Sequence, residues 1–250
     1  RVVAAVSYID ALRQKRRTTE YESGEKKVFY GLLPESISHE GYSAKPMHSY
    51  WDDFFGLRGL KDAVFLATFL GKDEEAKAWA RIRDEFSADV HASLRLVIER
   101  KGIDWLPGCA ELGDFDATSS TAALAPGGEL ARLPRAAVER TFAKYLENVA
   151  RREAGEGEIY TPYELRTVGS FVRLGRRDEA LRLLDLFFRD LRPAEWNAWG
   201  EVVWRDPRTP KFLGDVPHTW VGSDFARSFL DFFAYERQDD AALVVAAGIP

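Results

Sequence analysis

Hydrophobic residues recur at near-helical spacing through most of the chain. In the first such segment, residues 2–16, they stand at Val3, Val6, Ile9 and Leu12, which is the pattern of a helix with one buried face. The same periodicity predicts further helices at 53–70, 73–101, 134–153, 161–174, 177–191 and 223–236. A last apolar segment covers 238–247, and no alternating pattern predicts a strand of useful length. The pattern therefore predicts an all-α fold.

Residues that begin and end helices support several of these boundaries. Gly71 and Gly102 follow hydrophobic periodic segments, where a glycine favours the left-handed conformation that ends a helix. Pro134 stands where a first helical turn tolerates proline. The segment Thr161-Pro162-Tyr163-Glu164 has the composition of a capping box, which predicts a helix running to Leu174.

One local pattern occurs twice, in residues 69–76 and 173–180. Each copy has a helix end, a glycine and then an acidic first turn, which indicates a tight hairpin of two helices. Repeated hairpins occur in helical solenoids and in closed α/α toroids. The connections at 18–50, 102–120 and 192–221 are long while the others are short. A solenoid would have a regular period, so the uneven loops favour a toroid with its long loops at one end.

The bulk composition limits the possible partners. With 250 residues, 46% hydrophobic and 30% charged, the chain can bury a large core in one large domain or two small ones. The net charge of −5 and the scattered basic residues argue against nucleic acid as a partner. No apolar run is long enough for a membrane span. Cys109 is the single cysteine, so no intrachain disulfide can form.

The ends of the sequence and its histidines add two expectations. The chain has no initiator methionine and opens inside a helical pattern, so we expect it to be part of a longer protein with further domains upstream. None of its four histidines is paired at i, i+4. We therefore predict no metal site and no cofactor.

Aromatic residues gather in the long loops, together with acids and histidines. The first loop contains Tyr50-Trp51-Asp52-Asp53, and it also holds His39, Glu40 and His48. One of the two aspartates is expected to cap the following helix, which leaves the other for a ligand. Apolar walls would raise its pKa toward that of a general acid. Aromatic rings in loops suit the stacking of sugars, but they are equally typical of core anchors.

The other two long loops supply further acids. In the second loop, Asp116 is expected either to cap a short helix or to reach a ligand, and Asp114 and Glu111 are alternatives for the ligand. In the third loop, Glu201 follows a glycine and has three tryptophans nearby, Trp196, Trp199 and Trp204. Glu201 is either a reacting carboxylate or the partner of an arginine such as Arg205 or Arg58.

Three segments stand in order along the chain: Gly31-Leu32-Leu33-Pro34, residues 50–54, and Glu201 followed by Asp215 and Thr219-Trp220. Together they resemble the six-hairpin glycosidases, the (α/α)6 toroid enzymes that include glucoamylases. The first segment resembles a turn that precedes their acid-bearing segment. The segment 50–54 resembles the Leu-Trp-Glu-Glu segment of glucoamylases, which maps the general acid onto Asp52 and a sugar-binding neighbour onto Asp53. Glu201, followed by Asp215 and Thr219-Trp220, resembles their general-base segment. The chain departs from the glucoamylase pattern in having aspartates in place of glutamates and Val221 in place of a serine. The resemblance therefore does not imply a starch-type substrate.

The resemblance implies a toroid, and residues 1–250 would form either a single domain or the C-terminal two-thirds of one. About eight helices are predicted, fewer than six hairpins need, so we expect the toroid to lack its N-terminal part. The expected activity is inverting glycoside hydrolysis of an oligo- or polysaccharide, with Asp52 as acid and Glu201 as base. The side chains expected to bind the sugar are His39, Glu40, His48, Tyr50, Trp51, Asp53, Asp116, Trp196, Trp199, His218 and Trp220.

Two alternatives remain open. A polysaccharide lyase or sugar epimerase on the same toroid would use histidine and tyrosine as base and acid, with His39, His48, His218 and Tyr42 as the residues that matter. A non-catalytic helical binding module would instead present a groove along stacked hairpins, with no acid-rich pocket.

Overall fold

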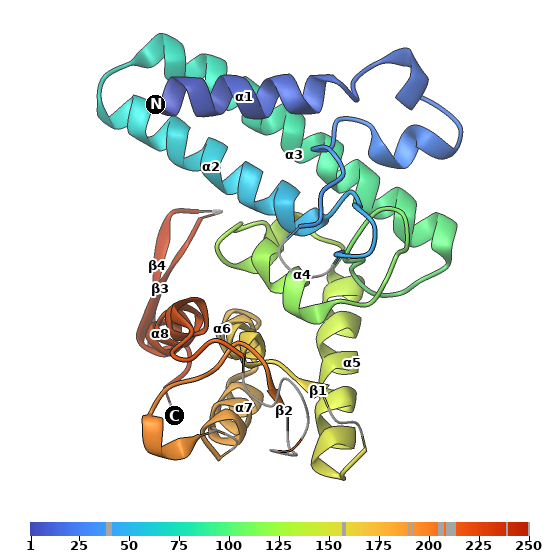
Figure 1. The fold of residues 1–250 in the computed structure, drawn as a ribbon. Helices are drawn as coiled ribbons and strands as arrows, with labels where there is room; N and C mark the ends of the chain where they lie inside the picture. The colour runs from blue at the N-terminus through green and yellow to red at the C-terminus, as the bar shows by residue number, and fades with distance from the viewer. Residues whose placement is uncertain are drawn as a thin grey trace. The chain divides into compact units, whose positions relative to one another are not determined.

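The computed structural model describes residues 1–38, 42–156, 159–189, 191, 193–204, 208, 214–238 and 240–249. The chain divides into two compact units, Arg1–Thr141 and Phe142–Pro250. Helices dominate both units, as Figure 1 shows, and the prediction of a mostly α-helical fold is confirmed. No helix in the described part of the chain is both long and apolar enough to cross a membrane.

The first unit is built on three long helices. They are α1 (Val2–Gln14), α2 (Tyr50–Phe69) and α3 (Asp73–Lys101), and α1 contacts both of the others (Figure 1). Short elements complete the unit: the 3-10 turns η1 (Thr19–Tyr21), η2 (Glu25–Phe29) and η3 (Leu130–Arg132), the helix α4 (Ala117–Leu124) and the start of α5 (Arg135–Glu153). Its core includes Leu57, Leu60, Phe86, Val90 and Leu94, each at most 1% exposed.

The second unit packs two helices on a third. The helices are α6 (Arg166–Arg173), α7 (Arg177–Arg189) and α8 (Thr219–Phe233), and α6 contacts both α7 and α8. The short elements are the 3-10 turns η4 (Pro162–Leu165) and η5 (Ala194–Trp196) and four strands: β1 (Ile159–Tyr160), β2 (Val203–Trp204), β3 (Ala234–Arg237) and β4 (Ala242–Val245). Phe171, Leu183, Phe187 and Val221 are fully buried in its core.

The repeated sequence pattern forms the same helix ending in both units. After α2, Gly71 has φ +66°, and the Lys72 amide donates to the Ala67 carbonyl at 2.8 Å. After α6, Gly175 has φ +72°, and the Arg176 amide donates to the Phe171 carbonyl at 2.9 Å. These bonds define a Schellman motif, which needs a left-handed residue and therefore favours glycine. The two predicted helical hairpins are confirmed.

Several predicted helix boundaries are wrong. The helix predicted at 53–70 begins three residues earlier, at Tyr50, with Ser49 as its N-cap. The helix predicted at 223–236 begins earlier, at Thr219, and ends at Phe233, because the strand β3 begins at Ala234. The segment predicted as a helix from residue 161 begins with the 3-10 turn η4, and the Glu164 carboxylate expected to complete the capping box binds Arg152 and Tyr145.

The expectation that the chain has no useful strand is also wrong. The apolar segment 238–247 contains β4, which pairs antiparallel with β3 from Ala234 opposite Val245 to Arg237 opposite Ala242. The side chains of β4 alternate between half-buried and exposed, as the two-residue period of a strand requires. β1 and β2 form a second two-stranded pairing.

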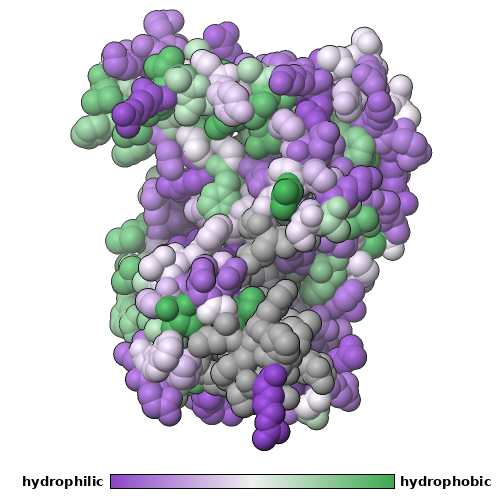
Figure 2. Space-filling view, in the orientation of Figure 1, coloured by the Kyte–Doolittle hydropathy of each residue, from purple (hydrophilic) through white to green (hydrophobic). Residues whose placement is uncertain are grey.

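The face of the molecule in Figure 2 has hydrophobic residues in separate groups among hydrophilic ones. Exposed hydrophobic residues include Phe65, Leu66, Phe69 and Leu70 at the C-terminal end of α2. Phe65 and Phe69 stack with their ring centroids 6.3 Å apart, so the two rings partly cover each other.

The Gly31→Ala variant is expected to unfold more easily, by roughly 3 kcal/mol. Gly31 has φ +70°, and an added Cβ would lie 2.1 Å from Oδ2 of Asp89, whose carboxylate binds Arg13. Gly71→Ala is the matched control, because Gly71 also has positive φ but nothing lies within 4 Å of its added Cβ. We expect this control to lose roughly 1 kcal/mol, because alanine is strained in the left-handed conformation. If chemical denaturation gave the same loss of unfolding free energy for both variants, the Asp89 side chain would be able to move away from the added methyl group without destabilising the fold.

Candidate functional site

The first predicted acid, Asp52, lies in the opening turn of α2 in the first unit. Its half-buried carboxylate accepts hydrogen bonds from the hydroxyls of Ser36 and Ser38, the latter at 3.1 Å. Among the described residues it forms no ion pair, so its bonds come from neutral donors. Trp51 beside it is 7% exposed, with its ring centroid 4.8 Å from that of Phe55.

Asp53 is buried. The prediction that one of the two aspartates caps α2 is wrong, because the N-cap residue is Ser49. Oδ1 of Asp53 accepts the amide of Leu33 at 3.0 Å, and its side chain is 1% exposed. Burial raises the pKa of the Asp53 carboxyl well above its ordinary value, because the charged form loses its hydration. The buried carboxyl of Asp53 therefore joins the preceding loop to α2 through the Leu33 amide.

The Asp53→Asn variant is expected to be more stable than the parent chain at neutral pH, by about 1 kcal/mol or more. A carboxyl whose pKa rises on folding stabilises the fold below its unfolded-state pKa and loses that contribution as pH rises toward the folded-state pKa. Asparagine keeps the oxygen that accepts the Leu33 amide and has no charge to bury. Denaturation at pH 7 and at about pH 4 tests this, because the gain should shrink in acid. Asp53→Ala, which removes the acceptor, should destabilise the fold at both pH values.

His48 is also buried and occupied by protein partners. Arg16 donates to its Nε2 at 2.8 Å, which leaves the ring proton on Nδ1, 2.6 Å from Glu111. Burial alone would raise the pKa of Glu111, but the hydrogen bonds from His48 lower it overall. The ring of Phe29 stacks on the imidazole at 4.4 Å. Both nitrogens of His48 therefore serve to hold the loop, and the ring offers none to a sugar.

Two other residues of the first unit that are predicted to bind a sugar, Tyr50 and Asp116, also have protein partners. The Tyr50 hydroxyl lies 2.7 Å from Oγ of Ser93, and the side chain is 2% exposed. Asp116 caps α4, where its Oδ1 accepts the Ser119 amide at 2.9 Å, so the capping interpretation is confirmed. His39 and Glu40 lie outside the described residues.

The second predicted acid, Glu201, belongs to a cluster in the second unit. Ligand atoms of Glu201, Asp215 and His218 all lie within 4.8 Å of one another. Backbone hydrogen bonds hold the two loop segments together, from Glu201 to Asp215 at 3.1 Å and from His218 to Trp199 at 3.0 Å. A side chain at Gly214 would place its Cβ 3.0 Å from that of Glu201, so glycine allows this close approach.

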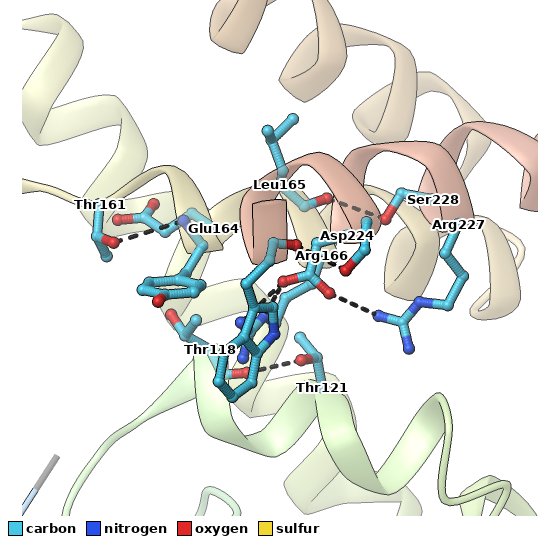
Figure 3. A network of polar contacts seen from close by, with 12 residues as sticks. Thr118, Thr121, Thr161, Glu164, Leu165, Arg166, Asp224, Arg227 and Ser228 are labelled. Carbon is cyan, nitrogen blue, oxygen red and sulfur yellow. Dashed lines mark hydrogen bonds and ion pairs between the residues drawn. The ribbon is translucent and has the colours of Figure 1, made fainter. Parts of the chain in front are cut away.

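A buried polar network supports the histidine of this cluster. The Tyr163 hydroxyl lies 2.6 Å from Nε2 of His218, and the Arg166 guanidinium lies 4.9 Å from the centre of the Tyr163 ring. Arg166 in turn donates to Asp224 of α8 at 2.9 Å, as Figure 3 shows. Burial raises the pKa of Asp224, although the neighbouring Arg166 opposes the rise. The network joins η4 to α8 and orients the imidazole.

The tryptophans of this unit differ in exposure. Trp199 is 9% exposed and packs against Phe188 and Phe225. Trp220 is 41% exposed, with its ring centroid 5.7 Å from that of Tyr163. Trp196, in η5, is 60% exposed. Trp199 therefore anchors the loop, whereas Trp220 and Trp196 have ring surface available for stacking.

Tyr163 and Arg166 were not predicted as site residues. Tyr163 was interpreted only as part of a capping box, and its partner His218 is 55 residues away along the chain. The sequence carries no local signal for such a contact. Asp215 was noted only through the family resemblance.

The first unit also has a cavity of about 410 Å³ between its 3-10 turns and α3. Tyr21, Tyr30 and Asp89 lie among its walls. Of the residues predicted to bind a sugar, none that the structure describes lines this cavity.

Searches of protein-family models, curated proteins and solved structures give no significant match to the chain.

Proposed function

We propose that the chain is a glycoside hydrolase of the α/α toroid type, with Asp52 as the general acid and Glu201 as the general base of an inverting reaction. The observation that carries the proposal is the setting of Glu201. Its half-buried carboxylate lies with Asp215 and His218 in a loop that contains Trp199, and no described residue forms an ion pair with it. A base must keep a lone pair for the proton of water, and an ion pair would reduce that basicity.

The alternative reading of Glu201 is an ion pair with an arginine such as Arg205 or Arg58. Arg58 binds Asp62 of its own helix at 2.8 Å. The other, Arg205, lies outside the described residues. The remaining support for catalysis comes from Asp52, whose serine partners suit both of its protonation states. A hydroxyl donates to the ionised carboxylate and accepts from the protonated one, so Ser36 and Ser38 can serve the acid before and after it gives up its proton.

In this mechanism the protonated Asp52 gives its proton to the glycosidic oxygen as the bond to the anomeric carbon breaks. Glu201 takes a proton from a water molecule that attacks this carbon from the opposite face. Trp220 and Trp196 stack on sugar rings. The reaction inverts the anomeric centre and needs the two carboxyl groups roughly 6.5–9.5 Å apart. The hairpins α2–α3 and α6–α7 are then two hairpins of the toroid.

Hydrolysis by the full chain tests the proposal directly. Aryl glycosides and oligosaccharides of several sugars are incubated with the protein, and the anomer first released is identified by proton NMR. We expect one sugar class to be cleaved with inversion. Retention of configuration would exclude the base role of Glu201, and the absence of cleavage across the panel would count against the hydrolase.

The Tyr163–His218 pair favours a second candidate, a polysaccharide lyase or sugar epimerase on the same fold. A histidine hydrogen-bonded to a tyrosine at 2.6 Å provides a base and an acid for removing and returning a proton next to a carboxylate. Uronate polymers distinguish the two reactions, because a lyase releases an unsaturated sugar that absorbs ultraviolet light. Loss of this product in Tyr163→Phe, but not in Glu201→Gln, would favour the lyase.

A further inference from the structure

We propose that Glu201, Asp215 and His218 form a binding site for one divalent transition-metal ion. The cluster offers one imidazole nitrogen and two carboxylate oxygens, and these atoms lie within 4.8 Å of one another. Ions such as Zn²⁺ and Mn²⁺ bind such atoms at about 2.0–2.2 Å, which separates neighbouring ligands by about 3–4 Å. Small side-chain movements would therefore bring all three ligand atoms within bonding distance of one ion, and water molecules would complete its coordination.

The histidine has the support that metal-binding histidines need. The Tyr163 hydroxyl lies 2.6 Å from Nε2 of His218, which leaves Nδ1 for the ion, and in the metal-bound form Nε2–H would donate to the tyrosine oxygen. A hydrogen bond at the second ring nitrogen fixes the orientation and the tautomer of a ligating imidazole. The guanidinium of Arg166, which donates to Asp224, packs against the ring of this tyrosine. The backbone bonds between the two loop segments keep the carboxylates close before any ion arrives.

The charge of the cluster separates it from the other histidine–carboxylate groups in the chain. Glu129 binds His91 but also the ammonium of Lys61 at 2.6 Å. Glu35 lies near His48 but also binds Arg16. At Glu201 and Asp215 no cation from the described residues balances the two carboxylates. Two converging negative charges repel one another, and a divalent cation between them removes that repulsion.

The ion would regulate the site on which the proposed function rests. A carboxylate that binds a metal cannot at the same moment accept a proton from water. We therefore expect the metal-loaded chain to lose the hydrolysis that depends on Glu201. The binding itself does not depend on hydrolysis, so the two proposals can fail separately.

Titration calorimetry of the full chain with Zn²⁺ and with Mn²⁺ tests the site. We expect one ion per chain, with affinity at least about 10-fold weaker in each of Glu201→Gln, Asp215→Asn and His218→Gln. Glu195→Gln, an exposed acid of η5 in the same unit, is the matched control and should bind as the parent does. Tyr163→Phe should weaken binding less than loss of a ligand, because it removes only the support of His218. Circular dichroism confirms that each variant folds.

Two results would overturn the metal site: no binding by the parent chain, or binding that all three ligand variants leave unchanged. A glycoside assay in the presence of Zn²⁺ then separates the proposals. Ion binding that the ligand variants weaken, in a chain that cleaves no glycoside, keeps the metal site and rejects the hydrolase. Cleavage without any ion binding keeps the hydrolase and rejects the metal site.

Discussion

Glu201→Gln and Asp52→Asn are each expected to lower kcat for an oligosaccharide about 10²–10⁴-fold, with little change in folding stability. Glutamine cannot take the proton of the attacking water, and asparagine cannot protonate the departing oxygen. Both substitutions keep the size of the side chain, and neither carboxylate holds the fold through an ion pair with a described residue. Initial rates and thermal unfolding of the purified variants measure the two effects.

The leaving group distinguishes the acid from the base. The dinitrophenolate group of a dinitrophenyl glycoside leaves without being protonated. On this substrate Asp52→Asn should therefore have most of the parent rate, while Glu201→Gln stays slow. Glu74→Gln, an exposed acid on α3, is the matched control and should keep full activity on both substrates. Loss of both activities in Asp52→Asn would mean that this residue acts in binding or folding, and not as the acid.

The sequence predicted the elements whose signals are local. The glycines at 71 and 175 stand where the left-handed conformation is needed, so both hairpins could be placed before any coordinates. Asp116 was predicted as a possible cap because a cap and its helix are neighbours in sequence. These features depend on interactions within a few residues, which composition and spacing reveal.

The features that the sequence could not supply depend on contacts between distant segments. Asp53 was expected to cap or to bind a sugar, but it accepts the amide of Leu33, 20 residues earlier. The pattern of 238–247 is a short apolar run, which periodicity alone cannot assign to helix or strand; pairing with β3 decided it. For the same reason the segment 161–164 predicts only the start of a helix, although the Tyr163 hydroxyl lies 2.6 Å from Nε2 of His218.

The candidate site shows the same division. The sequence identified Asp52 and Glu201 through their loops and through a family resemblance, and the structure places them in the first and second units respectively. It brings Glu201, Trp199 and His218 together, but it takes His48 and Tyr50 into the interior. Acids and aromatic residues in a loop are therefore candidates, and their hydrogen-bond partners decide which remain available to a ligand.

The largest expected loss of stability in the first unit comes from Glu129→Ala, about 3–5 kcal/mol. Glu129 is 1% exposed, and its carboxylate binds His91 at 2.7 Å and Lys61 at 2.6 Å. Removing it takes the counter-charge from a buried cluster that joins α2 and α3 to the loop before η3. Urea denaturation measures the loss. Glu179→Gln, which breaks only the partly exposed pair with Arg176, should change stability by less than about 0.5 kcal/mol.

The pH dependence of stability provides a second measure of the same residue. Burial alone would raise the pKa of Glu129, but the bonds from His91 and Lys61 outweigh it and lower the pKa to about 2. A carboxyl with a lowered pKa stabilises the fold above its unfolded-state value, and that contribution is lost as pH falls through the folded-state value. The parent chain should therefore lose about 3 kcal/mol between about pH 4.5 and pH 2 through this group. Glu129→Gln has no proton to bind there, so its stability should fall less over the same range. If the unfolding free energies of the parent and of Glu129→Gln fell in parallel with pH, the bonds from His91 and Lys61 would not be lowering the pKa of Glu129.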